Sequence, residues 1–132
     1  MNIKDFKVGQ TVYIELTGNA SRGRMPEQCI EEWEITSVGR KYIKAGRKSD
    51  DGIWEERTFE YRENYGRFVE KTDCCVNYIL YLKRKEIEEK HEKSRLIDEV
   101  GAFFRDWSKP KKLSIEQLKR IKEILGEVMI CE

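Results

Sequence analysis

The sequence has very little proline, a single histidine and almost no net charge. In 132 residues there are two prolines and one histidine, and 26 basic residues are balanced by 25 acidic ones to leave a net charge of +1. A basic field over the whole chain, the usual sign of nucleic-acid binding, is therefore absent, and an anion site would have to be a local patch. No run of about 18 consecutive apolar residues occurs, as a membrane-spanning helix requires, and no apolar segment follows Met1 that resembles a signal sequence. We therefore expect a soluble, cytoplasmic protein.

Residue types that ligate metals or act as nucleophiles are also poorly placed. Cys29, Cys74, Cys75 and Cys131 have no C-x-x-C spacing, so we expect reduced thiols. His91 has no second histidine to complete a metal site, and we expect a solvated surface residue. A serine or cysteine nucleophile would need this same histidine as its base, and no Walker-type or dinucleotide-binding glycine motif is present. The sequence predicts a protein that is not an enzyme and has no cofactor or metal.

Several stretches within residues 1–82 alternate apolar and polar side chains, as half-buried β-strands do, and Val76–Leu82 is apolar on both faces, as a covered strand is. The alternation predicts about six strands, at Thr11–Leu16, Cys29–Val38, Lys41–Gly46, Ile53–Tyr61, Tyr65–Glu70 and Val76–Leu82. Three glutamates in the second of these strands indicate a possible bulge. The segment Thr17–Gln28 has no periodicity and gathers glycine, serine, asparagine and proline, which predicts a long loop.

The stretch Ile35–Gly46 predicts a β-hairpin. A two-residue turn at Gly39 and Arg40, with positive φ at the glycine, would place Ser37 opposite Tyr42. One face of the hairpin would then carry Val38, Ile43 and Ala45, and the other Trp33, Ile35, Tyr42 and Lys44. Because both faces carry large side chains, we expect both to be covered.

Residues 83–132 have helical periodicity. The segment Lys83–Trp107 predicts one helix, and because its first half is nearly all charged, we expect only its second half to pack deeply. Pro110 interrupts the pattern, and Ser114 with Gln117 forms a capping-box signature for a second helix that ends or bends at Gly126. Two amphipathic helices with a short break predict a helical hairpin, packed on the barrel or on a second copy of the chain. We expect a homo-oligomer.

These patterns together predict an α+β protein. A small antiparallel SH3-like β-barrel or curved sheet of about six strands, in residues 1–82, would be followed by two C-terminal amphipathic helices, in residues 83–132. No flexible linker separates the two parts, so we expect residues 1–132 to form a single unit.

Basic residues cluster around the predicted hairpin. Five cations occur within nine residues, at Arg40, Lys41, Lys44, Arg47 and Lys48, with no acid between them. Arginine forks and lysines bind phosphate, and an aromatic ring stacks on a base. The residues predicted to bind a ligand are Asn19, Arg22, Arg24, Trp33, Arg40, Lys41, Tyr42 and Lys44. Solvated strand faces and core aromatic residues would produce the same pattern, and this reading stays open.

Four segments carry a resemblance to a known group of proteins. They are GNASR (Gly18–Arg22), VGRKYI (Val38–Ile43), YILYLKRKEIEEK (78–90) and LSIEQLKRIKEIL (113–125). They resemble small β-barrel domain proteins from phages and mobile elements of Gram-positive bacteria. The resemblance implies an SH3-like barrel followed by helices, and it supplies no catalytic residues.

Phage proteins of this size often act by binding, as inhibitors of CRISPR nucleases or as sponges for nucleotide immune signals. We therefore expect a non-enzymatic phage-type binding protein that counters host defence. Its partner would be a phosphate-bearing nucleotide, held at the basic cluster, or a defence protein, held at the charged helix Lys85–Lys93 or at the aromatic sheet face. The alternative is a nucleic-acid-binding small-barrel regulator, whose affinity would fall steeply with salt.

Overall fold

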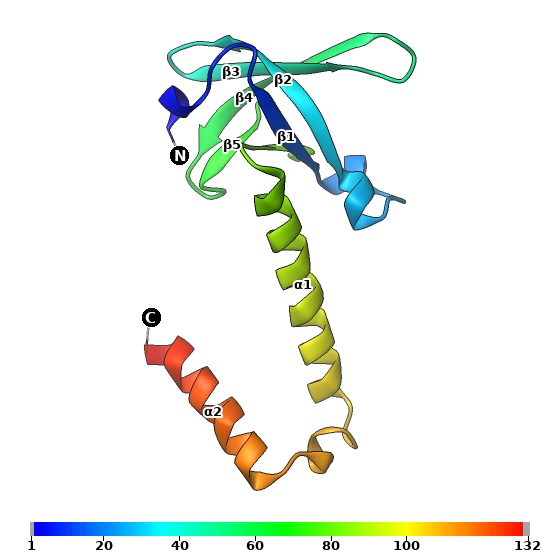
Figure 1. Cartoon of the computed structure of the whole chain (residues 1–132), viewed down its shortest axis with the longest axis vertical. Helices are drawn as coiled ribbons and strands as arrows, with labels where there is room; N and C mark the ends of the chain where they lie inside the picture. Colours follow the sequence, from blue (N-terminus) through cyan, green and yellow to red (C-terminus); the bar gives the residue numbers. More distant parts are fainter. Residues whose placement is uncertain (1, 131–132) are drawn as a thin grey trace. The chain divides into compact units, whose positions relative to one another are not determined.

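The computed structural model describes the backbone of residues 2–130 and the side chains of residues 2–128. Within these residues the strands are β1 (Thr11–Leu16), β2 (Ile30–Val38), β3 (Tyr42–Lys48), β4 (Trp54–Arg62), β5 (Arg67–Glu70) and β6 (Tyr78–Tyr81). The α-helices are α1 (Arg84–Arg105) and α2 (Ile115–Ile130), as Figure 1 shows. Short 3-10 helices are η1 (Ile3–Asp5), η2 (Gly18–Ser21), η3 (Pro26–Cys29) and η4 (Pro110–Lys112).

The chain forms two compact units, Met1–His91 and Glu92–Glu132. The first contains the six described strands and the start of α1, and the second contains the rest of α1 together with α2. The composition of the sequence changes at Lys83, but the division between the units lies further along, inside α1. Residues 84–91 of α1 therefore belong with the strands.

The strands close into an antiparallel barrel in which each pairs with the next and β6 pairs back with β1. Because the barrel is closed, each described strand has a neighbouring strand on both sides, which removes a common route to aggregation. The predicted fold class is confirmed: a six-stranded antiparallel β-barrel is followed by two helices. Strand β1 begins and ends at the predicted residues, because strict alternation over six positions is an unambiguous signal.

The interior of the barrel is filled by apolar side chains from every strand. They are Phe6, Val12, Ile14, Leu16, Cys29, Trp33, Ile35, Ile43, Ala45, Phe59, Phe68 and Leu80, all buried. Aromatic rings meet edge to face within it: the ring centroids of Trp33 and Phe59 are 6.2 Å apart, and those of Phe6 and Phe68 are 5.3 Å apart. Such pairs add roughly 0.5–1.5 kcal/mol each beyond the burial of their surface.

The β2–β3 hairpin differs from its predicted register. Val38 pairs with Ile43, so four residues lie between the paired residues instead of the two predicted, and the Gly39 amide donates to the Tyr42 carbonyl at 2.9 Å. Gly39 does not take the positive φ that was predicted. The pairing shifts between Ile35 and Ser37, which is a bulge at Thr36.

The bulge also corrects the predicted faces of the hairpin. Because one extra residue lies in β2, Trp33 and Ile35 face the barrel interior together with Ile43 and Ala45. The other face needs no second core, since Tyr42 is half-buried and Lys44 is exposed there. The expectation that both faces are covered was wrong.

The segment between β1 and β2, predicted as an unstructured loop, contains η2 and η3. It is tied to the residues before β6: the Thr17 hydroxyl donates to the Val76 carbonyl at 2.9 Å, and the Asn19 amide donates to Asn77 Oδ1 at 3.1 Å. Gly18 has φ +55°, and a Cβ there would lie 2.7 Å from Asn77 Oδ1. Glycine is therefore required for this close approach.

The start of α1 covers part of the outside of the barrel. Ile87 is fully buried in a second apolar cluster, formed with Ile30, Val69, Val76, Ile79 and Tyr81. The sequence predicted that only the second half of this helix packs deeply, and that prediction was wrong. Ile87 lies among charged residues, but its burial holds the first two turns of α1 against the barrel. Lys90 and His91, which follow it on the same side of the helix, contact Glu15 of β1.

The helical unit begins at residue 92. The predicted capping box before α2 is present: the Gln117 amide donates to Ser114 Oγ at 3.1 Å, and the Ser114 amide donates to Gln117 Oε1 at 2.9 Å. Helix α2 continues through Gly126 to Ile130 instead of ending at the glycine. Neither described helix is long and apolar enough to cross a lipid bilayer.

Candidate ligand-binding surface

The clearest candidate site surrounds Tyr42, at the start of β3. The ammonium group of Lys71 lies 4.5 Å from the centre of the Tyr42 ring, and that of Lys41 lies 5.4 Å from it. Lys44 follows two residues later on the same outward strand face, and Arg40 precedes Lys41 in the connection. We call Arg40, Lys41, Tyr42, Lys44 and Lys71 the Tyr42 cluster. Two ammonium groups within reach of one tyrosine ring are favourable cation–π contacts.

The four cations of the Tyr42 cluster are not neutralised. In the described part of the chain, none of them has a carboxylate within 4.0 Å. The nearest candidate on the neighbouring strand, Glu60, pairs with Arg62 instead, at 3.1 Å. The cluster is therefore a local patch of positive charge on a chain that is nearly neutral overall, as an anion site requires.

A shallow hollow of about 350 Å³ adjoins the cluster at the same end of the barrel. Arg40 and Lys41 line it together with Asn2, Ile3, Tyr61 and Phe68. Tyr61 is half exposed and packs edge to face on Phe68, with ring centroids 5.7 Å apart. The hollow thus offers an aromatic wall beside two cations, which suits a flat ligand that carries negative charge.

The structure places the other predicted cations elsewhere. Arg24 lies near the start of β2, where its Nη1 is 4.0 Å from Glu31 Oε2. Val38, at the other end of β2, lies seven positions after Glu31, which is about 23 Å along a strand. Arg22 is exposed on the same segment as Arg24, and Asn19 bonds to Asn77. The predicted site is therefore divided, and only Arg40, Lys41, Tyr42 and Lys44 come together.

Trp33, which the sequence predicted to stack on a base, lies inside the barrel and is not at the surface where a ligand would bind. Its side chain is only 2% exposed, and it packs against Phe59 inside the barrel. Its indole Nε1 donates to Glu31 Oε1 at 3.3 Å. The correction has the same cause as the wrong hairpin faces, since the bulge at Thr36 turns Trp33 inward.

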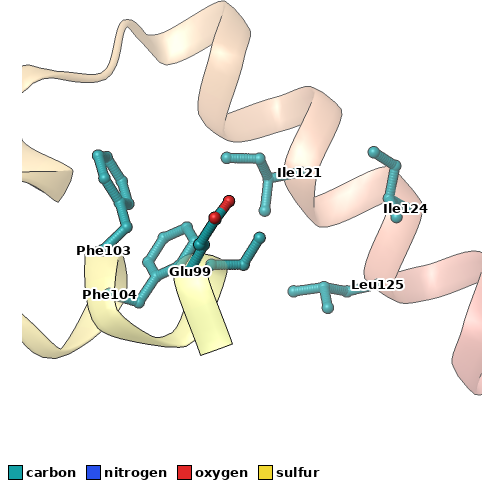
Figure 2. Close-up of a pocket in the computed structure, with 7 residues that line it drawn as sticks. Glu99, Phe103, Phe104, Ile121, Ile124 and Leu125 are labelled. Atoms are coloured by element: carbon teal, nitrogen blue, oxygen red, sulfur yellow. The ribbon is translucent and has the colours of Figure 1, made fainter. Parts of the chain in front are cut away.

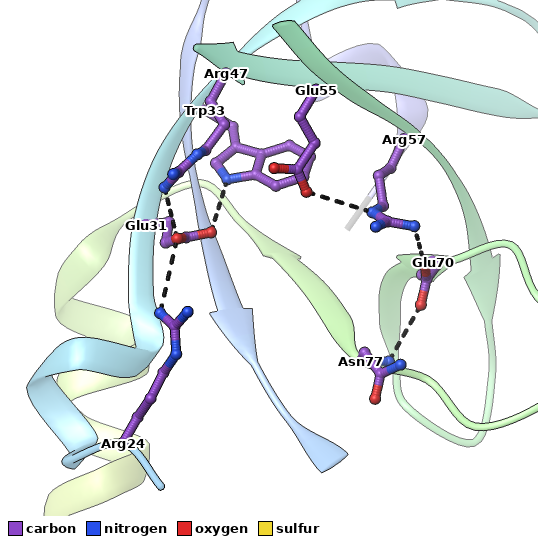
Figure 3. Close-up of polar contacts among 8 residues, drawn as sticks. All are labelled: Arg24, Glu31, Trp33, Arg47, Glu55, Arg57, Glu70 and Asn77. Atoms are coloured by element: carbon purple, nitrogen blue, oxygen red, sulfur yellow. Dashed lines mark hydrogen bonds and ion pairs between the residues drawn. The ribbon is translucent and has the colours of Figure 1, made fainter. Parts of the chain in front are cut away.

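The end of the barrel near Glu31 carries charged side chains that pair with each other. Figure 3 shows Arg24 and Arg47 converging on Glu31, with Arg47 Nη1 at 2.5 Å from its carboxylate. It also shows Arg57 between Glu55 and Glu70, at 3.7 and 3.1 Å. Because each of these three arginines has a carboxylate partner, the charges at this end of the barrel neutralise one another and do not indicate an anion site. Arg47, which the sequence grouped with the free cations, belongs to this end.

A buried carboxylate, Glu15, lies where α1 meets the outside of β1. Its oxygens accept from the Tyr81 hydroxyl at 2.9 Å and from Lys90 Nζ at 2.8 Å, and Oε2 lies 2.9 Å from His91 Nε2. Burial acts to raise the pKa of Glu15, but the hydrogen bond and charge of Lys90, with Tyr81 and His91, outweigh it and lower the pKa below its ordinary value. Burial, together with the charge of Glu15, raises the pKa of Tyr81.

His91 was expected to be a solvated surface residue, but in the structure its side chain contacts Glu15 and is mostly covered. His91 lies four residues after Ile87 on the same helix face, which is the signal that could have revealed it. Among the described side chains, the hydrogen-bond partners of Glu15 are Tyr81 of β6 and Lys90 and His91 of α1. The group therefore acts as an attachment between helix and barrel. Among residues 2–130, no group of three or more histidine, cysteine, aspartate or glutamate side chains is placed to hold a metal ion.

The closed six-stranded barrel with two following helices defines this chain as a small β-barrel domain protein. Its sequence matches the family of the Phage ProQ C-terminal-like domain over residues 1–128. The chain belongs to this family, and it is therefore a phage-type domain. Comparison with curated proteins found no match, and comparison with solved structures found none either.

Proposed function

We propose that this phage-type domain is a non-enzymatic binding protein that counters a host defence by sequestering a phosphate-bearing nucleotide signal at the Tyr42 cluster. The observation that carries the proposal is that the ammonium groups of Lys41 and Lys71 lie 5.4 and 4.5 Å from the centre of the Tyr42 ring, while none of the described carboxylates forms an ion pair with either lysine. Membership of a phage family supports the setting, because small phage domains often act by binding host molecules.

The chemistry of the cluster suits a nucleotide. The guanidinium of Arg40 offers a planar fork for two phosphate oxygens, and the lysines add point charges that tolerate several phosphate positions. Tyr42 and Tyr61 present aromatic surface on which a base can stack, worth roughly 1–3 kcal/mol per base. A patch of four cations is small, which favours a short ligand over a long nucleic acid.

The proposal is tested by isothermal titration calorimetry of the full chain against a panel of linear and cyclic nucleotides. Arg40→Ala with Lys41→Ala should weaken binding by at least about 100-fold, because two charge-assisted hydrogen bonds of about 1.5–3 kcal/mol each are lost. The melting temperature should hardly change, since both side chains are exposed. Lys93→Ala with Arg120→Ala removes the same amount of charge from exposed positions in the helices and is the matched control.

Two results would count against the nucleotide proposal. One is unchanged affinity in the Arg40 and Lys41 variant, and the other is absence of nucleotide binding by the natural chain. In the second case, binding of a DNA or RNA strand that weakens steeply with salt would favour the nucleic-acid alternative. Binding of a defence protein that is insensitive to these two substitutions would favour the protein-partner form.

A further inference from the structure

The helical unit contains an apolar groove with a volume of about 680 Å³. Val100, Phe103 and Phe104 of α1 line one side, and Ile121, Ile124 and Leu125 of α2 line the other. Figure 2 shows the aromatic rings of α1 and the aliphatic side chains of α2 facing one another across this space, with the carboxylate of Glu99 as its polar neighbour. A groove of this kind accepts an apolar helix face.

The described residues of the helical unit expose more apolar side chains than those that line the groove. Ten large ones are 43–87% exposed: Leu96, Ile97, Val100, Phe104, Trp107, Ile115, Leu118, Ile124, Leu125 and Val128. Scattered single residues of this kind are ordinary on protein surfaces, but a continuous apolar face marks an interaction site. A unit of about 40 residues also buries too little surface to be stable by itself.

The sequence of the helices fits a helical bundle. In α1 the residues Leu96, Val100 and Phe103 are spaced by four and three positions, and Trp107 follows four positions later, just beyond the end of the helix. In α2 Leu118, Ile121, Leu125 and Val128 are spaced by three, four and three positions. This alternation is the heptad spacing of helices that pack in coiled coils and four-helix bundles. A hairpin of two such helices is half of a four-helix bundle.

We propose that the groove is occupied by the same helices of a second copy of this chain, so that two hairpins form a four-helix bundle. At roughly 100 Å² for each half-exposed side chain, the ten exposed residues offer about 1,000 Å², close to the approximately 800 Å² that each partner buries in a stable interface. A face that carries both the groove and the matching heptad helices is self-complementary, as a two-fold dimer requires.

The proposal does not depend on nucleotide binding, because the Tyr42 cluster belongs to the other unit. It gives the chain two copies of that cluster in each assembly. Loss of dimerisation and loss of ligand binding are therefore separate results that different substitutions produce.

Sedimentation velocity of the full chain over a range of concentrations tests the proposal. The natural chain should sediment with twice the mass of one chain, and Leu125→Glu should weaken the dimer at least tenfold, since a carboxylate would be buried in the groove. Lys119→Glu places the same charge on an exposed position of α2 that does not line the groove, and it should leave the dimer intact. A natural chain that is monomeric at all concentrations would overturn the proposal.

Lysine cross-linking of mixed isotope-labelled and unlabelled chains provides a second measurement, which remains informative if Leu125→Glu fails to fold. Cross-links between copies should concentrate on lysines of the helical unit, such as Lys93 and Lys119. A dimer whose cross-links between copies join only the barrels would contradict the proposal. So would a monomer in which hydrogen exchange shows the groove residues to be protected, because the chain would then cover its own groove.

Discussion

The carboxylate of Glu15 in β1 lies 2.9 Å from the imidazole Nε2 of His91 in α1, although 76 residues separate them in sequence. Lys90 and Tyr81 bond to the other carboxylate oxygen. One buried acid therefore joins the first strand, the last strand and the first α-helix. Because its side chain is only 5% exposed, few of its interactions are with water.

Replacing this acid should destabilise the barrel unit. Glu15→Gln keeps the size of the side chain but removes the charge that Lys90 and His91 contact, and we expect a loss of about 1–3 kcal/mol in the free energy of unfolding. Urea denaturation followed by circular dichroism measures it. Glu34→Gln, at an exposed position of β2, is the matched control and should change stability by less than about 0.5 kcal/mol. Equal effects of the two substitutions would contradict the role of Glu15.

The same group predicts a dependence of stability on pH. The pKa of Glu15 is lowered in the folded chain, so its carboxylate stabilises the fold above the ordinary pKa of about 4.3 for glutamate. That stabilisation is lost as the pH falls through the lowered value, because the folded state must then take up a proton. Urea denaturation at a series of acidic pH values should show a steeper loss for the natural chain than for Glu15→Gln. Parallel curves would exclude a contribution from Glu15.

Trp33→Ala should reduce stability, because Trp33 belongs to the core of the barrel and not to the Tyr42 cluster. The indole is buried in the barrel against Phe59, and removal of such a side chain typically costs about 3–5 kcal/mol. Thermal denaturation of the variant should show a large fall in melting temperature or an unfolded chain. A variant with unchanged stability and lost nucleotide affinity would restore Trp33 as a stacking residue.

Gly46→Ala should destabilise the β3–β4 pair. A Cβ at this position would lie 2.5 Å from Trp54 Cζ2 and 2.6 Å from the Glu55 carbonyl oxygen, and the backbone atom cannot move without disturbing the ladder. Overpacking of this kind costs about 1–3 kcal/mol.

Gly126→Ala is the control for Gly46→Ala, because it makes the same chemical change where a Cβ meets nothing within 4 Å. Alanine in the middle of α2 should stabilise that helix by about 0.5–1 kcal/mol. Chemical denaturation compares the two variants with the natural chain. Changes of the same sign in both variants would refute the steric argument at Gly46.

Cysteine reactivity should differ between the barrel interior and its surface. Cys29 is buried and burial raises the pKa of its thiol, whereas Cys74 and Cys75 are exposed. Because the thiolate is the reactive form, alkylation of the folded chain should modify Cys74 and Cys75 more than about ten times faster than Cys29. Peptide mass spectrometry after timed exposure to iodoacetamide measures the rates. Equal rates would mean that the interior opens quickly.

Local patterns in the sequence were sufficient for the elements of the fold. Alternation placed β1 correctly, and the Ser114 and Gln117 pair located the start of α2, because both signals arise within a few residues. The register of the β2–β3 hairpin could not be predicted from such local patterns. The three glutamates of β2 indicated a possible bulge, but its position at Thr36 depends on how Glu34 and Ile35 pair with Gly46 and Ala45 across the ladder, and no short-range signal specifies that pairing.

The candidate site was predicted only in part, because some of its residues are neighbours in sequence and others come together only in the folded chain. Arg40, Lys41, Tyr42 and Lys44 are neighbours in sequence, and the structure keeps them together. Lys71 joins them through the fold, 29 positions after Tyr42, and no pattern near it indicates a site. The burial of Glu15 likewise depends on α1, which lies about 70 residues later in the sequence. The alternation of β1 alone predicts that Glu15 points outward, and it does not indicate that a helix covers it.

The attachment of α1 to the barrel also decides where this chain can be shortened. The composition of the sequence changes at Lys83, and a truncated variant ending at Leu82 would strip Ile87 from its cluster and leave an acid without its two helical partners. A variant that ends beyond His91 would keep them. The barrel therefore needs the first turns of α1, and a shortened chain that keeps the barrel intact must end after His91, inside a continuous helix.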